Sequence, residues 1–515
     1  MPTIYRIKSE NLSTRRIDPW HYQPDFSKQI SKITTRLCGN ELYSLIDQKR
    51  EVAGGATPLG ANYLETGRVR FYRTSEVDEL QLDADGAVFI TDQDDEKLAR
   101  SRLAAGDVLL TITGAKFGKS AVVTDKHLPG NISQHSVRFS PRADKLDSYF
   151  LIAYLNGPTG QIAIWREAYG ATRPAIDFPS VRSLIVPSVS DLAQKYIGDK
   201  VRQAERLRAW AKETESSVTR YHQALVPSQS TLNFAKRVRL VSPARMSERL
   251  DAHFYPGVVD DYLRLHQQKF KPLGELCTTI YNGQTQSETS SAISCKQITV
   301  TNLSSSFLGG TPRDVEMPGK KEKFLKPYDI LMCNAAHNKT YIGKDLTFVH
   351  SDSAILPSTE VMTLRVDRNQ VPASYIRAYL LTKLGYVQIQ STIRGITAHS
   401  YPDDMALLDI FVPELQDKDK DEWLACDEKL ALAGKACEIA TQLTHVAKSL
   451  VEALIEGQVT EVELIAAEHA LQAGNDQPDR HILNRLKTDG VDGQGQPLLS
   501  DLDQLYSLLQ QADHS

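Results

Sequence analysis

The sequence lacks every short motif that would place a familiar reaction centre in it. It contains no Gly-x-Ser-x-Gly, His-Glu-x-x-His or EF-hand loop, and no glycine-rich cofactor fingerprint follows an expected strand. The dipeptide Pro-Pro is also absent, so the Asn/Asp-Pro-Pro-aromatic element of amino methyltransferases cannot be present. We therefore predict that this chain carries no catalytic residues and binds no cofactor itself.

Cysteine is scarce, and the apolar runs are short. The six cysteines, which include no Cys-x-x-Cys pair and no His partner at zinc spacing, predict reduced and mostly buried thiols rather than a metal site. No apolar run approaches the ~18 residues that a membrane span requires. The first twenty residues also lack the apolar core of a signal peptide. These absences lead us to expect a cytoplasmic protein.

Charge is unevenly distributed along the chain. The formal net charge is −4, but residues 457–515 hold ten Asp/Glu against three Lys/Arg, whereas residues 195–249 hold twelve Lys/Arg against five Asp/Glu. A local basic stripe is typical of a surface that contacts phosphate, although a solvated basic linker would give the same pattern. Beyond its helical part, this stripe continues through Lys236, Arg237, Arg239, Arg245 and Arg249.

The most informative feature is an internal repeat with a shift of about 225 residues. Arg16-Ile17-Asp18 recurs as Arg249-Leu250-Asp251, and Asp107-Val-Leu-Leu recurs as Asp329-Ile-Leu-Met, with each Asp at the entrance of an expected strand. Further matches, in the same order along the chain, pair Gly55-Ala-Thr57 with Gly283-Gln-Thr285, Tyr154-Leu-Asn with Tyr379-Leu-Leu, Gly170-Ala-Thr172 with Gly395-Ile-Thr397, and Val186-Pro187 with Val412-Pro413. The sequence therefore predicts two tandem copies of one domain.

A long helix is predicted after each Val-Pro, because the apolar period changes there from two to about 3.5. Each helix has ten positions spaced alternately four and three residues apart, as in a heptad repeat. In the first helix these are Ala193, Ile197, Lys200, Ala204, Leu207, Ala211, Thr214, Val218, Tyr221 and Leu225. In the second they are Trp423, Cys426, Leu430, Ala433, Cys437, Ala440, Thr444, Ala447, Val451 and Leu454. The first helix starts the basic stripe and the second is acidic, which favours pairing of the two. Packing of each helix on its own domain is the alternative.

The stretch from Gly106 to Val123 resembles a phosphate-binding loop at first sight. However, only three residues separate Gly114 from Gly118, and β-branched residues follow where a nucleotide-binding loop requires a helix. We interpret it as strand 108–113, a tight loop and strand 121–124. A P-loop ATPase or nuclease that uses this loop is kept as an alternative.

Polar loops occur at matching places in the two copies, and their side chains suit base edges or phosphates. In the first copy the candidates for DNA binding are Thr113, Lys116, Lys119, Gln134, His135, Thr172 and Arg173. In the second they are Asn334, His337, Asn338, Lys339, Arg394, Thr397 and His399. Taken singly, each is also compatible with an ordinary surface residue, and Gln134 and His135 with buried groups at a strand start.

These motifs resemble the target-recognition domain of type I restriction-modification specificity subunits. The resemblance is carried by Gly106-Asp-Val-Leu-Leu-Thr-Ile-Thr-Gly-Ala-x-x-Gly-Lys, Asn131-Ile-Ser-Gln-His135, Tyr154-Leu-Asn, Gly170-Ala-Thr-Arg-Pro174, the Val-Pro strand and the long helix. It covers Arg16 to about Gly457, twice over, and does not reach the C-terminal tail.

The resemblance implies an α+β fold with two tandem α/β target-recognition domains, a long antiparallel two-helix coiled coil and a small helical C-terminal extension. The expected boundaries are 1–188 and 227–414 for the two domains, 189–226 and 415–457 for the helices, and 458–515 for the acidic extension. Within the helices, partner docking is expected at Ile197, Leu207, Val218, Tyr221, Trp423, Leu430, Val451 and Leu454.

The resemblance also implies a function. A chain of this family is a non-catalytic subunit that binds a split double-stranded DNA site and docks two methyltransferase subunits, which use S-adenosylmethionine. Two restriction subunits that use ATP and Mg are further expected partners. Because the loops differ between the copies, we predict an asymmetric site. A target-recognition subunit of another DNA defence or processing complex, one that does not methylate, is the alternative.

Overall fold

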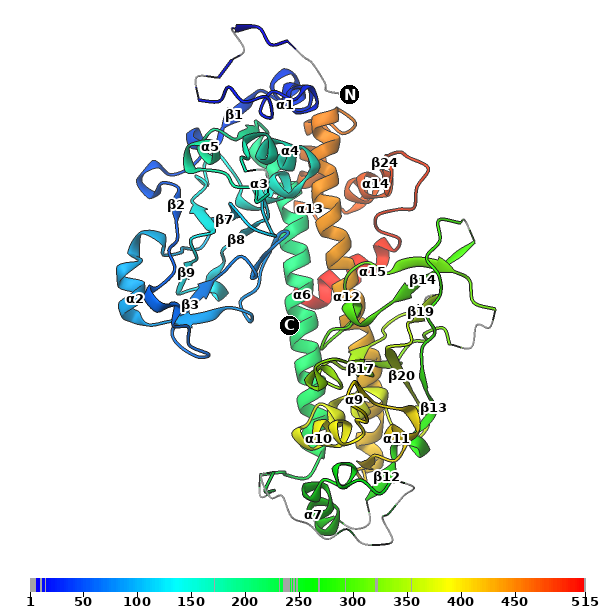
Figure 1. Cartoon of the computed structure of the whole chain (residues 1–515). Helices are drawn as coiled ribbons and strands as arrows, with labels where there is room; N and C mark the ends of the chain where they lie inside the picture. Colours follow the sequence, from blue (N-terminus) through cyan, green and yellow to red (C-terminus); the bar gives the residue numbers. More distant parts are fainter. Residues whose placement is uncertain are drawn as a thin grey trace. The chain divides into compact units, whose positions relative to one another are not determined.

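The computed structural model of the chain describes residues 6–513, apart from 10, 11, 14, 171, 231, 235–240, 242, 244, 245, 247, 248, 267, 268, 292, 320–322 and 353. The chain forms two compact units (Figure 1). Unit 1 consists of Met1–Arg206 and Ile439–His514, and unit 2 contains Leu207–Glu438. Four residues of the predicted basic stripe, Lys236, Arg237, Arg239 and Arg245, lie outside the described residues.

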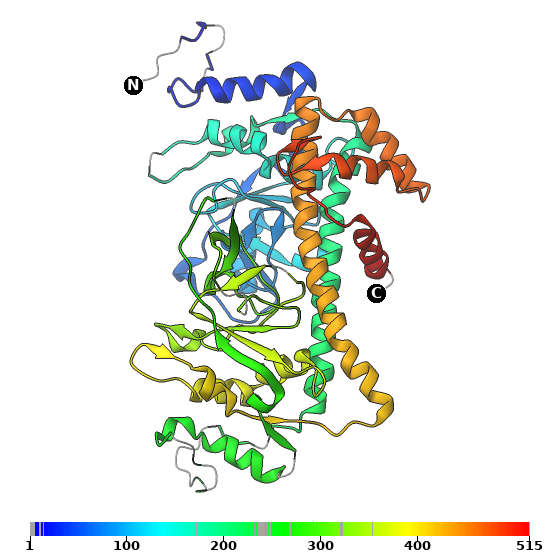
Figure 2. The same ribbon diagram turned by 90° about the vertical axis from the view of Figure 1, so that its right-hand side faces the viewer.

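Both long helices predicted after the Val-Pro strands are present. Helix α6 spans Asp191–Leu225 with 35 residues, and helix α12 spans Asp417–Glu456 with 40 residues. Gly457, with φ of +73°, ends α12 as predicted. The boundary between the units crosses both helices, so the first part of α6 belongs with the last part of α12 in unit 1. The two helices therefore run antiparallel, as Figures 1 and 2 show.

The two units contain the same sheets. Each has a four-stranded sheet, in the order β2-β10-β7-β8 in unit 1 and β13-β20-β16-β18 in unit 2. The strands of unit 1 are β2 (Ala53–Gly54), β10 (Ser136–Phe139), β7 (Val108–Thr111) and β8 (Ser120–Val122), and those of unit 2 are β13 (Cys277–Asn282), β20 (Val361–Val366), β16 (Ile330–Cys333) and β18 (Thr347–Phe348). The predicted repeat is therefore a repeat of topology as well as of motifs.

Two smaller sheets are repeated in the same way. The three-stranded sheets are β6 (Val88–Ile90), β3 (Val69–Tyr72), β9 (Gly130–Ile132) in unit 1 and β15 (Arg313–Glu316), β14 (Ser294–Ile298), β19 (Ile355–Pro357) in unit 2. In both, the second and third strands are parallel. The two-stranded sheets pair β1 (Gly39–Glu41) with β11 (Ile185–Pro187) and β12 (Phe270–Pro272) with β22 (Asp409–Phe411). Strand β11 contains Val186-Pro187, and β22 ends immediately before Val412-Pro413, so both correspond to the apolar strands predicted from the Val-Pro motifs.

Four helices of each unit follow the same order, whereas α2 of unit 1, between β6 and β7, and α8 of unit 2, between β12 and β13, have different places. Unit 1 has α1 (Pro24–Arg36), α2 (Asp92–Lys97), α3 (Ser148–Asn156), α4 (Pro158–Glu167) and α5 (Phe178–Arg182), and unit 2 has α7 (Gly257–Leu265), α8 (Leu273–Leu276), α9 (Ala373–Leu380), α10 (Lys383–Ser391) and α11 (Pro402–Ala406). A short hairpin of β4 (Val77–Asp78) and β5 (Gln81–Leu82) belongs to unit 1, and β17 (Ala335–Ala336) pairs with β21 (Ala398–His399) in unit 2. The motifs of the repeat are the residues that hold this framework together.

Matched tyrosines illustrate how the framework is held. The hydroxyl of Tyr22 donates to the carbonyl of Arg16 at 2.6 Å, and that of Tyr255 donates to Arg249 at 2.7 Å. Both bonds close the Arg-aliphatic-Asp turns, in which the arginine also donates to the aspartate at 2.6 Å in unit 1 and 2.8 Å in unit 2. A tyrosine that is buried in this way needs a partner for its hydroxyl, and the turn supplies it.

The acidic extension is a small helical layer in unit 1. It comprises α13 (Glu461–Gln472), α14 (Gln477–Arg485), the hairpin β23 (Leu486–Lys487) and β24 (Gly490–Val491), and α15 (Leu502–Asp513). The sequence predicts helical patterns at Glu461 to Ala473 and Leu499 to Ala512, which α13 and α15 match, whereas α14 has no predicted counterpart. In Figures 1 and 2 the extension, drawn in orange to red, lies on the side of α6 and α12 opposite the sheets of unit 1.

A buried charge cluster fixes this extension to α6. Asp479 accepts hydrogen bonds from Tyr196 and Tyr506 and from the ammonium group of Lys200, whose Nζ lies 2.7 and 2.9 Å from the two carboxylate oxygens. Lys200 and Asp479 are each 1% exposed. Burial alone would raise the pKa of the Asp479 carboxyl, but Lys200 and the two hydroxyls hold it below its ordinary value. The cluster therefore stays ionised.

Candidate nucleic-acid interface

The β7–β8 hairpin has the predicted form and excludes a nucleotide-binding loop at this place. Gly114 and Gly118 have φ of +99° and +81°, and the Gly118 N–H donates to the carbonyl of Thr111 at 2.9 Å, which closes the tip. Strand β8 begins at Ser120, where a phosphate-binding loop would open a helix. The P-loop ATPase hypothesis required a helix after Gly118, and this region forms a strand instead.

The lysines of this tip are held by acidic residues of the same unit. Lys116 Nζ lies 2.9 Å from Asp78 and 2.8 Å from the carbonyl of Ser75. Lys119 Nζ lies 3.4 Å from Glu79. Because their charges are already neutralised locally, these lysines are poorer phosphate contacts than the sequence indicated.

Three loops of unit 1 meet beside the hairpin tip. The Ile112 N–H donates to the carbonyl of His135 at 2.9 Å, and the Ile176 N–H donates to the carbonyl of Ile112 at 3.1 Å. Thr113 forms a β-bridge with Ala175. These bonds bring together candidates that are about 60 residues apart in sequence, of which Gln134, Thr172 and Arg173 are exposed and Thr113 and His135 are half-buried.

Unit 2 builds the same junction with different side chains. The Asn334 N–H donates to the carbonyl of Glu360 at 3.0 Å, and the Ser400 N–H donates to the carbonyl of Asn334 at 2.8 Å. Asn334 thus occupies the place of Ile112. In addition, β17 pairs with β21, so that Ala335 lies opposite His399. The exposed candidates here are His337, Asn338, Lys339, Arg394 and Thr397.

Glycine allows a fourth loop to join each junction. A Cβ atom on Gly55 would lie 1.9 Å from the carbonyl oxygen of Ile132, and one on Gly283 would lie 2.2 Å from that of Pro357. A Cβ atom would overlap these backbone carbonyl oxygens, so only glycine allows the two loops to lie this close together. Both glycines belong to the motif that is repeated in the sequence, and the structure gives the reason for it.

Three predicted DNA contacts of unit 2 serve the loops themselves. Asn334 is 3% exposed and its amide donates to the carbonyl of Thr359 at 3.1 Å, so its side chain does not reach the surface. Arg394 forms an ion pair with the buried Asp404, and its Nε lies 2.7 Å from that carboxylate. His399 uses Nδ1 to contact the carbonyl of Thr397 at 2.6 Å. Of these three, Asn334 is buried, whereas Arg394 is exposed and His399 half-buried although both are engaged within unit 2.

The residues predicted for partner docking lie inside the chain. Among the eight, Tyr221 is half-buried and the other seven are buried. The basic residues of α6 are also engaged: Lys195 with Glu468, Lys200 with Asp479, Arg202 with Asp147, Arg206 with Asp513 and Arg220 with Glu213. A protein that docks on these helices must therefore use their outward side chains, and the helical part of the basic stripe is not an open phosphate surface.

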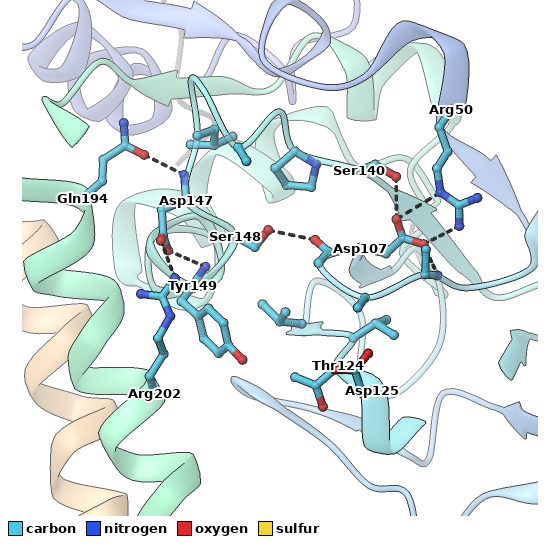
Figure 3. Close-up of a pocket in the computed structure, with 18 of the residues that line it drawn as sticks. Arg50, Asp107, Thr124, Asp125, Ser140, Asp147, Ser148, Tyr149, Gln194 and Arg202 are labelled. Atoms are coloured by element: carbon cyan, nitrogen blue, oxygen red, sulfur yellow. Dashed lines mark hydrogen bonds and ion pairs between the residues drawn. The ribbon is translucent and has the colours of Figure 1, made fainter. Parts of the chain in front are cut away.

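A pocket of about 570 Å³, whose wall includes six charged residues, lies at the opposite end of β7 from the hairpin tip (Figure 3). Arg50 contacts Asp107 there at 2.6 Å, and Arg202 of α6 is bound to Asp147. The remaining charged residues of its wall, Asp125 and Asp191, are acidic. With both arginines engaged, the pocket disfavours an anionic cofactor, and its contacts instead connect the sheet to α6.

A second, more apolar pocket of about 810 Å³ adjoins the Gly170 loop of unit 1. Its wall includes Trp20, Trp165 and Tyr169, which are all partly exposed. The indole N–H of Trp20 donates to the backbone carbonyl of Trp165 at 2.7 Å, which holds the Trp20 ring against α4. No sequence pattern indicated this pocket, because Trp20 and Trp165 are 145 positions apart.

Other kinds of site do not appear in the part of the chain that the structure describes. No group of three or more His, Cys, Asp or Glu residues there could hold a metal ion. The six cysteines, Cys38, Cys277, Cys295, Cys333, Cys426 and Cys437, form no disulfide in the described structure, and Cys38 is exposed rather than buried. A search of the described helices for a stretch with the length and hydropathy of a membrane span gives none.

The fold consists of two units with the same sheet order and matching loop junctions, and known proteins resemble the chain. The chain is 25% identical over 177 residues to the type I restriction enzyme EcoBI specificity subunit of Escherichia coli. This match covers 34% of the chain and 36% of that relative, so the chain matches only about a third of the relative's length. It confirms the resemblance to type I restriction-modification specificity subunits that the motifs indicate.

Solved structures of the same description are found as well. The specificity subunit from M. genitalium aligns over 84% of this chain and 95% of its own, with 13% identity and a TM-score of 0.37. The HsdS subunit from Thermoanaerobacter tengcongensis aligns over 82% and 97%, with 15% identity and a TM-score of 0.27. These scores are too low to establish a shared arrangement of the whole chain. No family model matches the sequence.

Proposed function

We propose that this chain is the DNA sequence-specificity subunit of a type I restriction-modification system, and that each unit reads one half of a bipartite, asymmetric double-stranded site. One observation carries the proposal: both units present the same four-loop junction at the end of the same sheet, but with different exposed side chains. A repeated scaffold with variable tips suits a ligand whose two halves are alike in backbone and different in sequence.

The position of the junctions supports a role in binding a large ligand. In Figure 2 the cyan-green loop after α4 in unit 1 and the yellow segment after α10 in unit 2 extend from their units on the side away from α6 and α12. The long helices then keep outward side chains for two methyltransferase subunits, in which S-adenosylmethionine would bind. Restriction subunits that use ATP and Mg would join the same complex in the cytoplasm.

Methylation mapping tests this proposal. The chain is co-expressed with the methyltransferase subunit encoded beside it, and N6-methyladenine is mapped across the host DNA. A split motif that disappears when Thr172 and Arg173 are both replaced by Ala supports the proposal. A stable complex without methylation would instead favour the alternative, a recognition subunit of a non-methylating defence or processing complex, for which the additional acidic extension is the motivating feature.

A further inference from the structure

The hairpin of residues 394–399 in unit 2 is held rigidly. The N–H groups of Arg394 and His399 exchange hydrogen bonds with each other's carbonyls at 2.8 and 3.1 Å. The β17–β21 pairing fixes one side of the hairpin, and the Arg394–Asp404 ion pair fixes its base. Gly395, with φ of +77°, forms the turn. The side chains at the tip are therefore presented in one geometry, and the entropic cost of ordering them on binding is already met.

The residue at this tip is an isoleucine without packing partners. Ile396 has a relative exposure of 106%, so its whole side chain lies in water. Exposed His337 and Lys339 belong to the β16 loop that the β17–β21 pairing joins to the same hairpin. An aliphatic side chain on a rigid tip beside polar and basic groups gains nothing in the folded chain alone, whereas it suits an apolar contact within a charged ligand.

The corresponding loop of unit 1 presents different chemistry. Thr172 and Arg173 are exposed there, and a Cβ on Gly114 would lie 3.9 Å from Arg173 Nη2, which places the guanidinium over the hairpin tip. Among the described residues, this guanidinium has no hydrogen-bond or ion-pair partner. Arginine binds the O6 and N7 atoms of guanine in a bidentate manner, whereas aliphatic side chains contact the C5-methyl group of thymine.

Building on the proposed function, we propose that Ile396 contacts the methyl group of a thymine in the half-site of unit 2, and that Arg173 contacts a guanine edge in the half-site of unit 1. Arg394, although it is the arginine nearest the unit 2 tip, serves as the anchor of the hairpin. The two half-sites thus differ in chemistry because one tip carries a free guanidinium and the other a free aliphatic group.

Modified bases test each contact separately on the purified full-length chain. The bound sequence is first selected from a random duplex library. Each thymine of the unit 2 half-site is then replaced by deoxyuridine, which lacks only the methyl group. Loss of one buried methyl predicts about a three- to fivefold weaker binding at one position, and Ile396→Ala should bind both duplexes equally. Similarly, 7-deazaguanine at one unit 1 position should weaken binding of the natural chain and leave Arg173→Ala unaffected.

Val462→Ala is the matched control, because Val462 is an exposed aliphatic residue on the extension. It should retain the full response to deoxyuridine. If Ile396→Ala responds to deoxyuridine as the natural chain does, the thymine contact is overturned while DNA specificity stands. If no sequence is enriched from the library, the proposed function itself fails, and the two failures are therefore distinguishable.

Discussion

Units 1 and 2 share their strand order, their glycine-dependent loop junctions and their Arg-aliphatic-Asp turns, but they differ in most of the exposed side chains at their loop tips. They also differ in what covers α6 and α12, since the described part of the acidic extension belongs to unit 1. The shared contacts stabilise the fold, because each forms a backbone turn or loop junction or supplies a hydrogen-bond partner to a buried polar group. Among the unshared side chains, Arg173 and Ile396 do neither, so they are available for recognition.

The repeated strand-entry aspartates make this distinction concrete. Asp107 accepts from the Ala104 N–H at 2.8 Å, and Asp329 accepts from the Lys326 N–H at 2.8 Å. Burial raises the pKa of the Asp329 carboxyl, and its ion pair with Arg365 opposes that rise. These carboxylates organise the base of the sheet, far from the variable tips, which explains why the sequence keeps them in both copies.

Breaking the buried cluster of the extension should produce the largest difference between the units. Asp479→Asn leaves Lys200 buried without a counter-charge, which we expect to cost about 3–5 kcal/mol. Hydrogen exchange followed by mass spectrometry should show loss of protection in α13–α15 and the first part of α6, while the sheets of unit 2 keep theirs.

Asp513→Asn is the control for that change. Asp513 also joins the extension to α6, through Arg206, but both side chains are 49% exposed, so the variant should lose less than about 1 kcal/mol. Equal exchange patterns in the two variants would mean that the buried cluster does not hold the extension in place.

Acid should weaken unit 2 through His222. Burial lowers the pKa of this imidazole to about 4, and its Nε2 donates to Ser374, whose hydroxyl donates to Asp427 at 2.6 Å. The unfolded chain binds the proton near pH 6.5. Between those values the unfolded state holds more protons, so stability falls as pH decreases, by up to about 3 kcal/mol at pH 4.

His222→Gln keeps a donor at the position of Nε2 but does not titrate. The variant should flatten the dependence of unit 2 stability on pH between 6.5 and 4.5, as measured by hydrogen exchange in α9. Unit 1 provides the internal reference, because its buried His127, whose pKa is likewise lowered to about 4, is untouched. An unchanged slope in unit 2 would show that His222 is accessible to protons in the folded chain.

Lysine substitutions at the tips should give the smallest effect and sharpen the comparison of the loops. Lys339 is exposed, so Lys339→Ala should weaken binding to all DNA sequences and reduce the slope of log affinity against log salt by about one. Lys116→Ala should leave that slope nearly unchanged, because Lys116 is paired with Asp78. The reverse order, measured by fluorescence anisotropy over a salt series, would restore Lys116 as a phosphate contact.

Most of the framework could be predicted from the sequence, because it depends on local patterns. The β-branched residues and the glycine spacing predicted the β7–β8 hairpin. The apolar positions spaced alternately four and three residues apart predicted both long helices. Helix α14 was missed because its residues, Gln477–Arg485, are mainly polar and pair with other parts of unit 1. A pattern of apolar spacing cannot detect a helix that is fixed by Asp479.

The candidate site was predictable only as a set of loops. Asn334 and Arg394 have the residue types of base readers, yet the structure uses one inside the loop junction and the other as an anchor. Ile396 was missed for the opposite reason, since an aliphatic residue in a sequence usually indicates a core position.

The sequence by itself determined the duplication, the paired long helices and the absence of recognisable reaction motifs, since repeats, periodicity and short motifs are properties of residue order. Only the tertiary structure decided which polar side chains are free. Lys116, Lys119 and Arg394 are paired with acids of their own units, whereas the Arg173 guanidinium has no partner among the described residues and Ile396 is fully exposed. That distinction depends on distances between residues far apart in the chain, and residue order does not encode those distances in any local pattern.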